Sequence, residues 1–82
     1  MLNAYNVTFD AVYTYTDEYL QKPVVQNRTV SVVLIETSFK AVFEKSLGMI
    51  GQEVTVSKDQ YRKSEETIDV TLAEVTSIQA IS

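Results

Sequence analysis

Residues 3–16 alternate between apolar and polar side chains with a period of two, and this pattern limits the possible folds more than any other feature of the chain. The side chains of the apolar phase are Tyr5, Val7, Phe9, Ala11, Tyr13 and Tyr15. The other phase is polar except for Val12. Because successive side chains of a strand point to opposite faces, the alternation predicts a long strand with one buried face.

The rest of the chain also favours strands. Twenty-six of its 82 residues are Val, Ile or Thr, and eight are Tyr or Phe; these types suit half-buried pleated surfaces. A second strand is predicted over residues 28–36, and its apolar side chains on both faces indicate a central strand that is covered on each side. The connection over residues 17–27 contains Pro23, which cannot donate to a strand ladder and so marks a loop or an edge.

The C-terminal part of the chain adds two more strands. Glu53 to Ser57 alternates as a third strand, and a fourth begins at Thr67. Its apolar phase changes after residue 72, because Val75 and Ile81 have the opposite parity. One extra residue in a strand moves later side chains to the other face, so we expect a bulge near residues 73–74.

One short amphipathic helix is predicted between the second and third strands. The apolar side chains at helical spacing are Phe39, Val42, Phe43 and Leu47. The hydroxyl of Thr37 or Ser38 can cap the N-terminus, and Gly48 lies where a left-handed C-cap is wanted. We expect the apolar face of this helix, Phe43 included, to lie in the core.

The order β-β-α-β-β defines the expected fold class. We expect a single α+β domain over residues 1–82, with a four-stranded, mostly antiparallel sheet and the helix on one face. A right-handed crossover through the helix would leave the second and third strands parallel. A compact domain of this length is about 30 Å across, whereas residues 3–15 would span about 40 Å when extended. The first strand must therefore bend or project, and projecting strands with apolar faces need a second chain to cover them.

The composition excludes most catalytic and metal-binding chemistry. The chain has no His and no Cys, and two Gly residues cannot form a phosphate-binding loop. Ser–Lys pairs are conceivable between Ser38 or Ser46 and the neighbouring Lys40 and Lys45, but they are expected on a solvated helix face. Two pairs of adjacent carboxylates, Asp17–Glu18 and Glu65–Glu66, are expected in loops. A ligand binder needs a pocket of roughly 300 Å³, for which a single sheet with one helix leaves little room. We therefore expect no enzyme, no cofactor and no metal.

The charge bears on the partner. Eleven acidic residues against seven basic ones give a net charge of −4, which argues against direct binding of nucleic acid or of an anionic membrane. The basic side chains of Lys58, Arg62 and Lys63 beside Tyr61 are interrupted by acidic residues and indicate a solvated loop. The lack of Cys fits a reducing compartment, and the N-terminus shows no signal-peptide pattern. We expect synthesis in the cytoplasm, with incorporation into a virion as a further destination.

The end of the first strand is the best candidate for a partner-binding site. Its aromatic side chains approach a charged turn, and tyrosine is favoured at protein interfaces. The predicted partner-binding residues are Tyr13, Tyr15, Asp17, Glu18 and Tyr19.

These features favour a non-catalytic protein that works by protein–protein contact, either with copies of itself or within a larger complex. Our preferred interpretation is a small phage-type structural or accessory subunit, such as a virion or decoration protein. The alternative is a small acidic inhibitor that binds a host protein, with a nucleic-acid-binding site as the target. The carboxylates of this chain are scattered along the sequence rather than spaced like the phosphates of a nucleic acid, so we place this alternative second.

Overall fold

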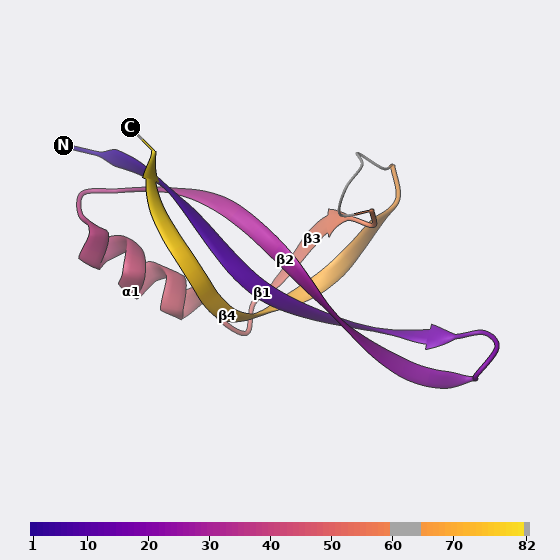
Figure 1. Cartoon of the computed structure of the whole chain (residues 1–82). Helices are drawn as coiled ribbons and strands as arrows, with labels where there is room; N and C mark the ends of the chain where they lie inside the picture. The colour runs from indigo at the N-terminus through magenta and orange to yellow at the C-terminus, as the bar shows by residue number, and fades with distance from the viewer. Residues whose placement is uncertain (60–64, 82) are drawn as a thin grey trace.

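The computed structural model describes residues 1–59 and 65–81, and these form four strands and one helix (Figure 1). The elements are β1 (Asn3–Asp17), β2 (Lys22–Glu36), α1 (Phe39–Met49), β3 (Glu53–Ser57) and β4 (Thr67–Ile81). The strands make one antiparallel sheet in the order β2-β1-β4-β3, and α1 covers part of one face. This confirms the predicted fold class and element order. Of the predicted basic cluster, Tyr61, Arg62 and Lys63 lie outside the described residues, whereas Lys58 lies inside them and is exposed.

The alternating stretch forms β1, which lies inside the sheet between β2 and β4. The buried apolar side chains are Tyr5, Val7, Phe9, Ala11, Val30, Val42, Val70 and Leu72. Half of them come from the apolar phase of β1, as the alternation predicted. They lie on the face of the sheet that α1 covers, which we call the core face. The even-numbered side chains of β1 point to the opposite, bare face.

The prediction for the connection after β1 was wrong. Only residues 18–21 form the turn, and β2 begins at Lys22. The turn is closed by the backbone N–H of Gln21, which donates to the carbonyl of Asp17 at 2.7 Å. Of the two positions predicted for Pro23, a loop or an edge, the structure shows the edge, because Pro23 pairs with Thr16 within the edge strand β2. An edge strand tolerates a residue that lacks a backbone donor.

The prediction that the second strand is central was also wrong, because β2 is an edge of the sheet. Val30, Val32 and Leu34 lie on the core face, whereas Val33 and Ile35 are exposed on the bare face. The parallel arrangement of the second and third strands does not form either. Strand β4 lies between β1 and β3, so α1 links strands at opposite edges of an antiparallel sheet.

Two bulges interrupt the pairing of β4 with β1. The register skips Ala73 and then Thr76. The first bulge confirms the one predicted near residues 73–74, and the second was not predicted. Each bulge reverses the phase of the strand, so Val75 and then Ile78 pack against the core while Ile81 is exposed.

The predicted N-cap of α1 is confirmed and its predicted C-cap is wrong. The side-chain oxygen of Ser38 accepts a hydrogen bond from the backbone N–H of Ala41 at 3.2 Å. At the other end the helix continues through Gly48, and Gly51 takes the left-handed conformation with φ of 92°. The helix therefore extends one residue past Gly48, and the glycine that the turn requires is Gly51.

The side of α1 that faces the sheet includes Val42, as predicted, but not the other three apolar residues of the predicted face. Val42 and Ser46 are buried, whereas Phe39, Phe43 and Leu47 are exposed. Phe43 keeps 44% of its surface, so its placement in the core was wrong. The Ser46 hydroxyl is not solvated either, because it donates to the carbonyl of Val42 at 2.7 Å inside the fold.

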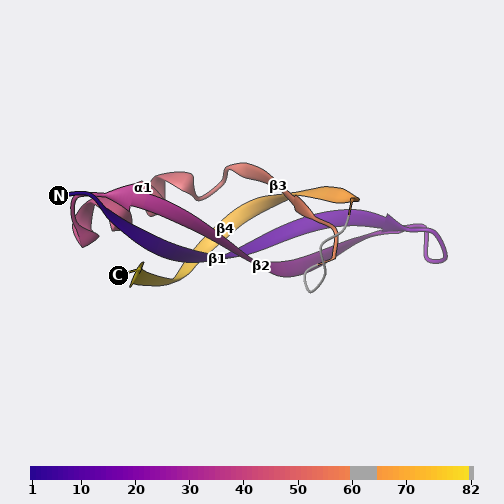
Figure 2. The same cartoon turned by 90° about the horizontal axis from the view of Figure 1, so that it is seen from above.

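The molecule is elongated because the first hairpin projects. Its extents are 52 × 24 × 15 Å and its radius of gyration is 14.8 Å, against about 12 Å for a compact chain of this length. Beyond the pair Val12–Thr71, β1 pairs with β2 alone. Residues 13–26 therefore form a two-stranded arm, which Figure 2 shows extending past the rest of the sheet. Of the two predicted outcomes for β1, projection is the one observed.

Candidate functional site

The arm brings two of the predicted partner-binding tyrosines together. The rings of Tyr13 and Tyr15 are stacked, with centroids 5.9 Å apart. The Tyr13 hydroxyl donates to the Oε1 atom of Gln26, and the Nε2 atom of Gln26 donates to the Tyr15 hydroxyl at 3.3 Å. Because both tyrosines come from the same phase of β1, the stack lies on one face of the arm.

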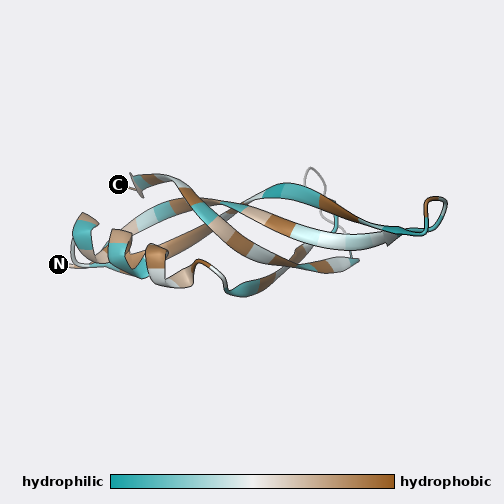
Figure 3. Ribbon diagram, turned by 90° about the horizontal axis from the view of Figure 1, so that it is seen from below, coloured by the Kyte–Doolittle hydropathy of each residue, from teal (hydrophilic) through white to brown (hydrophobic). Residues whose placement is uncertain are grey.

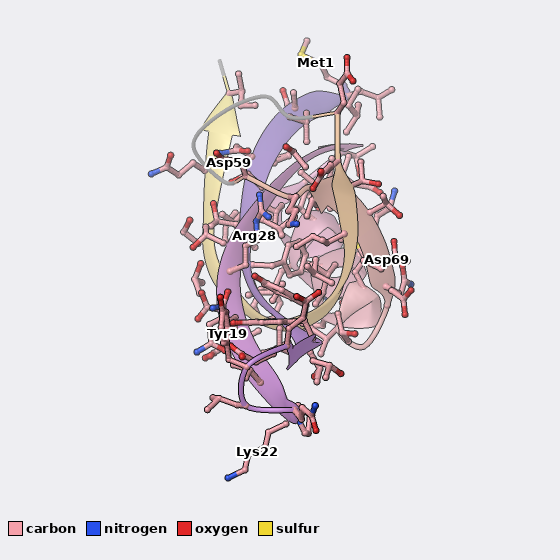
Figure 4. All side chains as sticks on the ribbon, turned by 90° about the vertical axis from the view of Figure 1, so that its right-hand side faces the viewer. Met1, Tyr19, Lys22, Arg28, Asp59 and Asp69 are labelled. Atoms are coloured by element: carbon pink, nitrogen blue, oxygen red, sulfur yellow. The ribbon has the colours of Figure 1, made fainter. Side chains whose placement is uncertain are left out.

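The other predicted residues occupy the tip of the arm. The Asp17 carboxylate accepts hydrogen bonds from the backbone N–H groups of Tyr19 and Leu20, at 2.9 and 3.0 Å. Asp17 therefore stabilises the turn. The side chains of residues 18–20 do not take part in these hydrogen bonds and can contact another molecule. Tyr19 is 98% exposed, and Glu18 and Leu20 are exposed beside it (Figure 4). Partner binding by these residues stays a prediction.

A hollow of about 490 Å³ lies between the arm and the β3–β4 hairpin. Its lining includes Tyr13, Tyr15, Gln26, Lys58, Ile68 and Asp69. We expected little room for such a space, but the arm leaves one, because β1 does not pair with β4 beyond Val12. The polar groups of the hollow bond to other side chains, as Asp69 accepts from the hydroxyl of Thr55 at 2.5 Å.

Arg28 ties the two sides of the hollow together. Its Nη1 atom donates to the carbonyl of Lys58 at 3.0 Å, across the gap between β2 and the end of β3 (Figure 4). Among the described residues, its buried Nε atom has no hydrogen-bond partner. Lys58 is held in turn by Glu66, whose carboxylate lies 3.1 Å from the ammonium nitrogen. The side chain of Arg28 thus braces the base of the arm.

An apolar stripe follows one flank of α1, and it is made of Phe39, Phe43, Leu47 and Ile50, all of them exposed. Successive helix residues are about 100° apart, which puts the stripe about a quarter turn from the line of buried residues. Lys45, on the other flank, pairs with Glu36 of β2 at 3.3 Å. The stripe therefore lies on the β4 side of the helix. Figure 3 shows the apolar residues of α1 as brown bands along the helix.

The stripe borders a free strand edge. Strand β3 pairs with β4 only through residues 67–71. The backbone of Leu72 still bonds to Gly51 and Gln52, and among the described residues no strand pairs with the same side of β4 beyond Leu72. Helical periodicity did signal the stripe, but the periodicity alone could not show whether a neighbour covers it.

The bare face of the sheet divides into two regions. Along β2, Val25, Val33 and Ile35 are 64%, 59% and 58% exposed. Toward β3, the face carries only acidic charges among its described strand residues. These acidic residues are Asp10, Glu53, Asp69 and Glu74, by their register and parity. Asp10 and Glu74 lie directly opposite each other, which is an unfavourable pairing of like charges.

The described residues contain no group of three or more acidic, His or Cys side chains placed to hold a metal ion. No helix in this described part of the chain is long and apolar enough to span a membrane. Comparison with protein-family models, with curated proteins and with solved structures finds no match for the chain.

Proposed function

We propose that the protein is a non-catalytic subunit that works by assembling with other protein chains, and that it is of the small structural or accessory kind found in phage particles. The observation that carries this proposal is the apolar stripe of α1. Two phenylalanines, a leucine and an isoleucine are exposed to water there. A small domain needs most of its apolar side chains to build a core, so leaving four of them exposed is costly. Contiguous exposed apolar surface on a protein usually marks an interaction site.

The stripe and the free edge of β4 form one surface for a protein partner. A chain that docks here gains apolar burial on α1 and backbone hydrogen bonds along β4. The arm adds a second contact region, because Tyr19 and Leu20 project from its tip. Aromatic side chains of this kind provide most of the binding energy in many interfaces.

The solution mass tests this proposal. We expect light scattering coupled to size-exclusion chromatography to give a multiple of 9.2 kDa that persists on dilution. The double variant Phe39→Ser with Phe43→Ser should weaken assembly by about a hundredfold, because each truncated aromatic anchor costs about 1–2 kcal/mol. The control variant Lys40→Ser with Glu44→Ser changes the residue that follows each phenylalanine. These two residues lie outside the apolar stripe, so this variant should assemble like the wild type. A wild-type protein that stays monomeric at every concentration contradicts the proposal.

The acidic region of the bare face supports a second candidate function, an inhibitor that binds a basic site on another protein. Four carboxylates share this region, and the facing pair Asp10 and Glu74 lowers stability without a structural return. A nucleic-acid-binding protein offers the complementary positive surface.

A short Lys/Arg-rich peptide serves as the probe for this second function. We expect Asp10→Asn with Glu74→Gln to lower its affinity by about tenfold at low salt, because two charges leave the binding face. Glu18→Gln with Glu44→Gln removes the same net charge from other surfaces and should have a smaller effect. Equal losses from both double variants would show that the peptide responds only to net charge.

A further inference from the structure

We propose that the outer edge of β2 pairs with the β2 edge of a second copy of this chain. The two strands run antiparallel in the register that opposes Lys22 to Glu36 of the partner subunit and Thr29 to Thr29 of the partner subunit. The result is a dimer with one continuous eight-stranded sheet. This inference rests on the proposed assembly function and adds to it the identity of one partner and the geometry of its contact.

The edge of β2 is long and has no built-in protection over much of its length. It offers 15 residues, and no described strand pairs with its outer side. Unpaired N–H and C=O groups along an edge form a template for another strand, and natural edges are usually blunted by charges, proline or bulges. From residue 29 to residue 35 the strand has none of these. The opposite edge strand, β3, offers only five residues, and the exposed part of the β4 edge is broken by two bulges.

The exposed apolar side chains of β2 match one another in this register. The register uses the whole strand, because Lys22, the first residue of β2, lies opposite Glu36 of the partner subunit, the last residue of that strand. The residue numbers of every opposed pair therefore add up to 58. Val25 then faces Val33 of the partner subunit, and Pro23 faces Ile35 of the partner subunit. These are the exposed apolar residues of β2 on the bare face. The twofold axis repeats each pair, and cross-strand apolar pairs of this kind stabilise a sheet.

The charges also fit this register. Lys22 is exposed at the tip of the arm, and the partner's Glu36 has the opposite sign. The remaining charged side chain of β2, Arg28, reaches across the sheet toward Lys58 and away from the edge. A shift of two residues would pair Val33 with the partner's Asn27 and move Lys22 away from the partner's Glu36. Complete overlap therefore gives the largest number of backbone hydrogen bonds and the best match of side chains.

Single cysteines can test the register, because the chain has none of its own. Thr29 lies on the twofold axis, where directly opposed Cα atoms are about 4.5–5.5 Å apart. A disulfide accepts Cα separations of about 4.4–6.8 Å. We expect Thr29→Cys, at an exposed position, to form a covalent dimer under mild oxidation at least tenfold faster than the controls.

The matched controls lie on the same strand and the same face. In the proposed register, Asn27 and its own copy are four residues apart along the strand, or about 13 Å. Asn27→Cys alone and Ser31→Cys alone should therefore not form disulfides, while an equal mixture of the two should give a covalent heterodimer. Circular dichroism on each variant confirms that it is folded.

The outcomes separate this inference from the proposed function. If the wild type assembles but Thr29→Cys cross-links no faster than Asn27→Cys, the β2 contact is wrong and the assembly function stands. Cross-linking of Asn27→Cys with itself would indicate parallel pairing or an antiparallel register centred on Asn27, and either would overturn the inference. A mass that grows without limit would point to pairing of β2 with β4 in an open chain of subunits. A wild-type monomer at every concentration contradicts both.

Discussion

Phe9→Ala is expected to remove about 3–5 kcal/mol from the free energy of unfolding, the typical cost of emptying a fully buried phenylalanine site. Phe9 has no exposed surface and lies in β1, where it pairs with Val30 on one side and Val75 on the other. A domain of this size has a total stability of about 4–12 kcal/mol. The variant should therefore lose between about a quarter and all of its stability, seen as a lower urea midpoint when unfolding at 25 °C is followed by circular dichroism.

Phe43→Ala is the matched control for this prediction. It deletes the same atoms from a side chain that is already half exposed, and the expected cost is about 1 kcal/mol. Both titrations are made at low protein concentration, because assembly would stabilise the folded state by mass action. Similar losses from the two variants would contradict the assignment of Phe9 to the core and of Phe43 to the exposed surface of α1.

The sequence predicted well which side chains of a strand share a face of the sheet. A period of two identified β1 and its buried face, and the change of phase after residue 72 predicted the first bulge of β4. The second bulge escaped notice because it restores the phase. Ile81 was therefore assigned to the wrong face, while Ile78, which packs against the core, was not identified. Periodicity records the net phase of a strand, and two compensating bulges cancel in it.

The predictions that were wrong concern which elements cover the apolar side chains of β2 and α1. Val33 and Ile35 on the second face of β2 indicated burial on both sides, and Phe43 at helical spacing indicated a core face. Both patterns show that a surface is apolar, but neither can tell a core contact within one chain from an exposed surface that another chain could cover. The stack of Tyr13 on Tyr15 shows the same limit, because its partner Gln26 was assigned to a loop.

The two proposed contacts are compatible in one assembly. A twofold axis perpendicular to the sheet keeps the core faces of both copies on the same side, so the dimer carries both helices on one face. The apolar stripes lie on the β4 side of each helix and point away from the β2 contact. Each dimer would therefore retain two exposed stripes for further contacts, which is the property that a structural subunit requires.

Opposite charges introduced at Val25 and Val33 are expected to preserve the dimer, and like charges at the same positions are expected to abolish it. In the proposed register these two residues face each other across the interface, twice per dimer. Val25→Glu with Val33→Glu places like charges in direct opposition, whereas Val25→Lys with Val33→Glu places a lysine opposite a glutamate. Each cross-strand pair differs by about 1–2 kcal/mol between the two cases, so the dimer constants should differ by about a hundredfold.

The comparison isolates the interface because the cross-strand partner of each residue within its own chain is uncharged. Val25 pairs with Thr14 and Val33 pairs with Asn6, and both side chains are exposed, so the monomer should lose no more than about 0.5 kcal/mol in either variant. Sedimentation at low salt measures the two dimer constants, and added salt should narrow the difference because it screens both pairs. Equal dissociation of the two variants would show that Val25 and Val33 do not meet, and that the chains associate through the stripe or the arm instead.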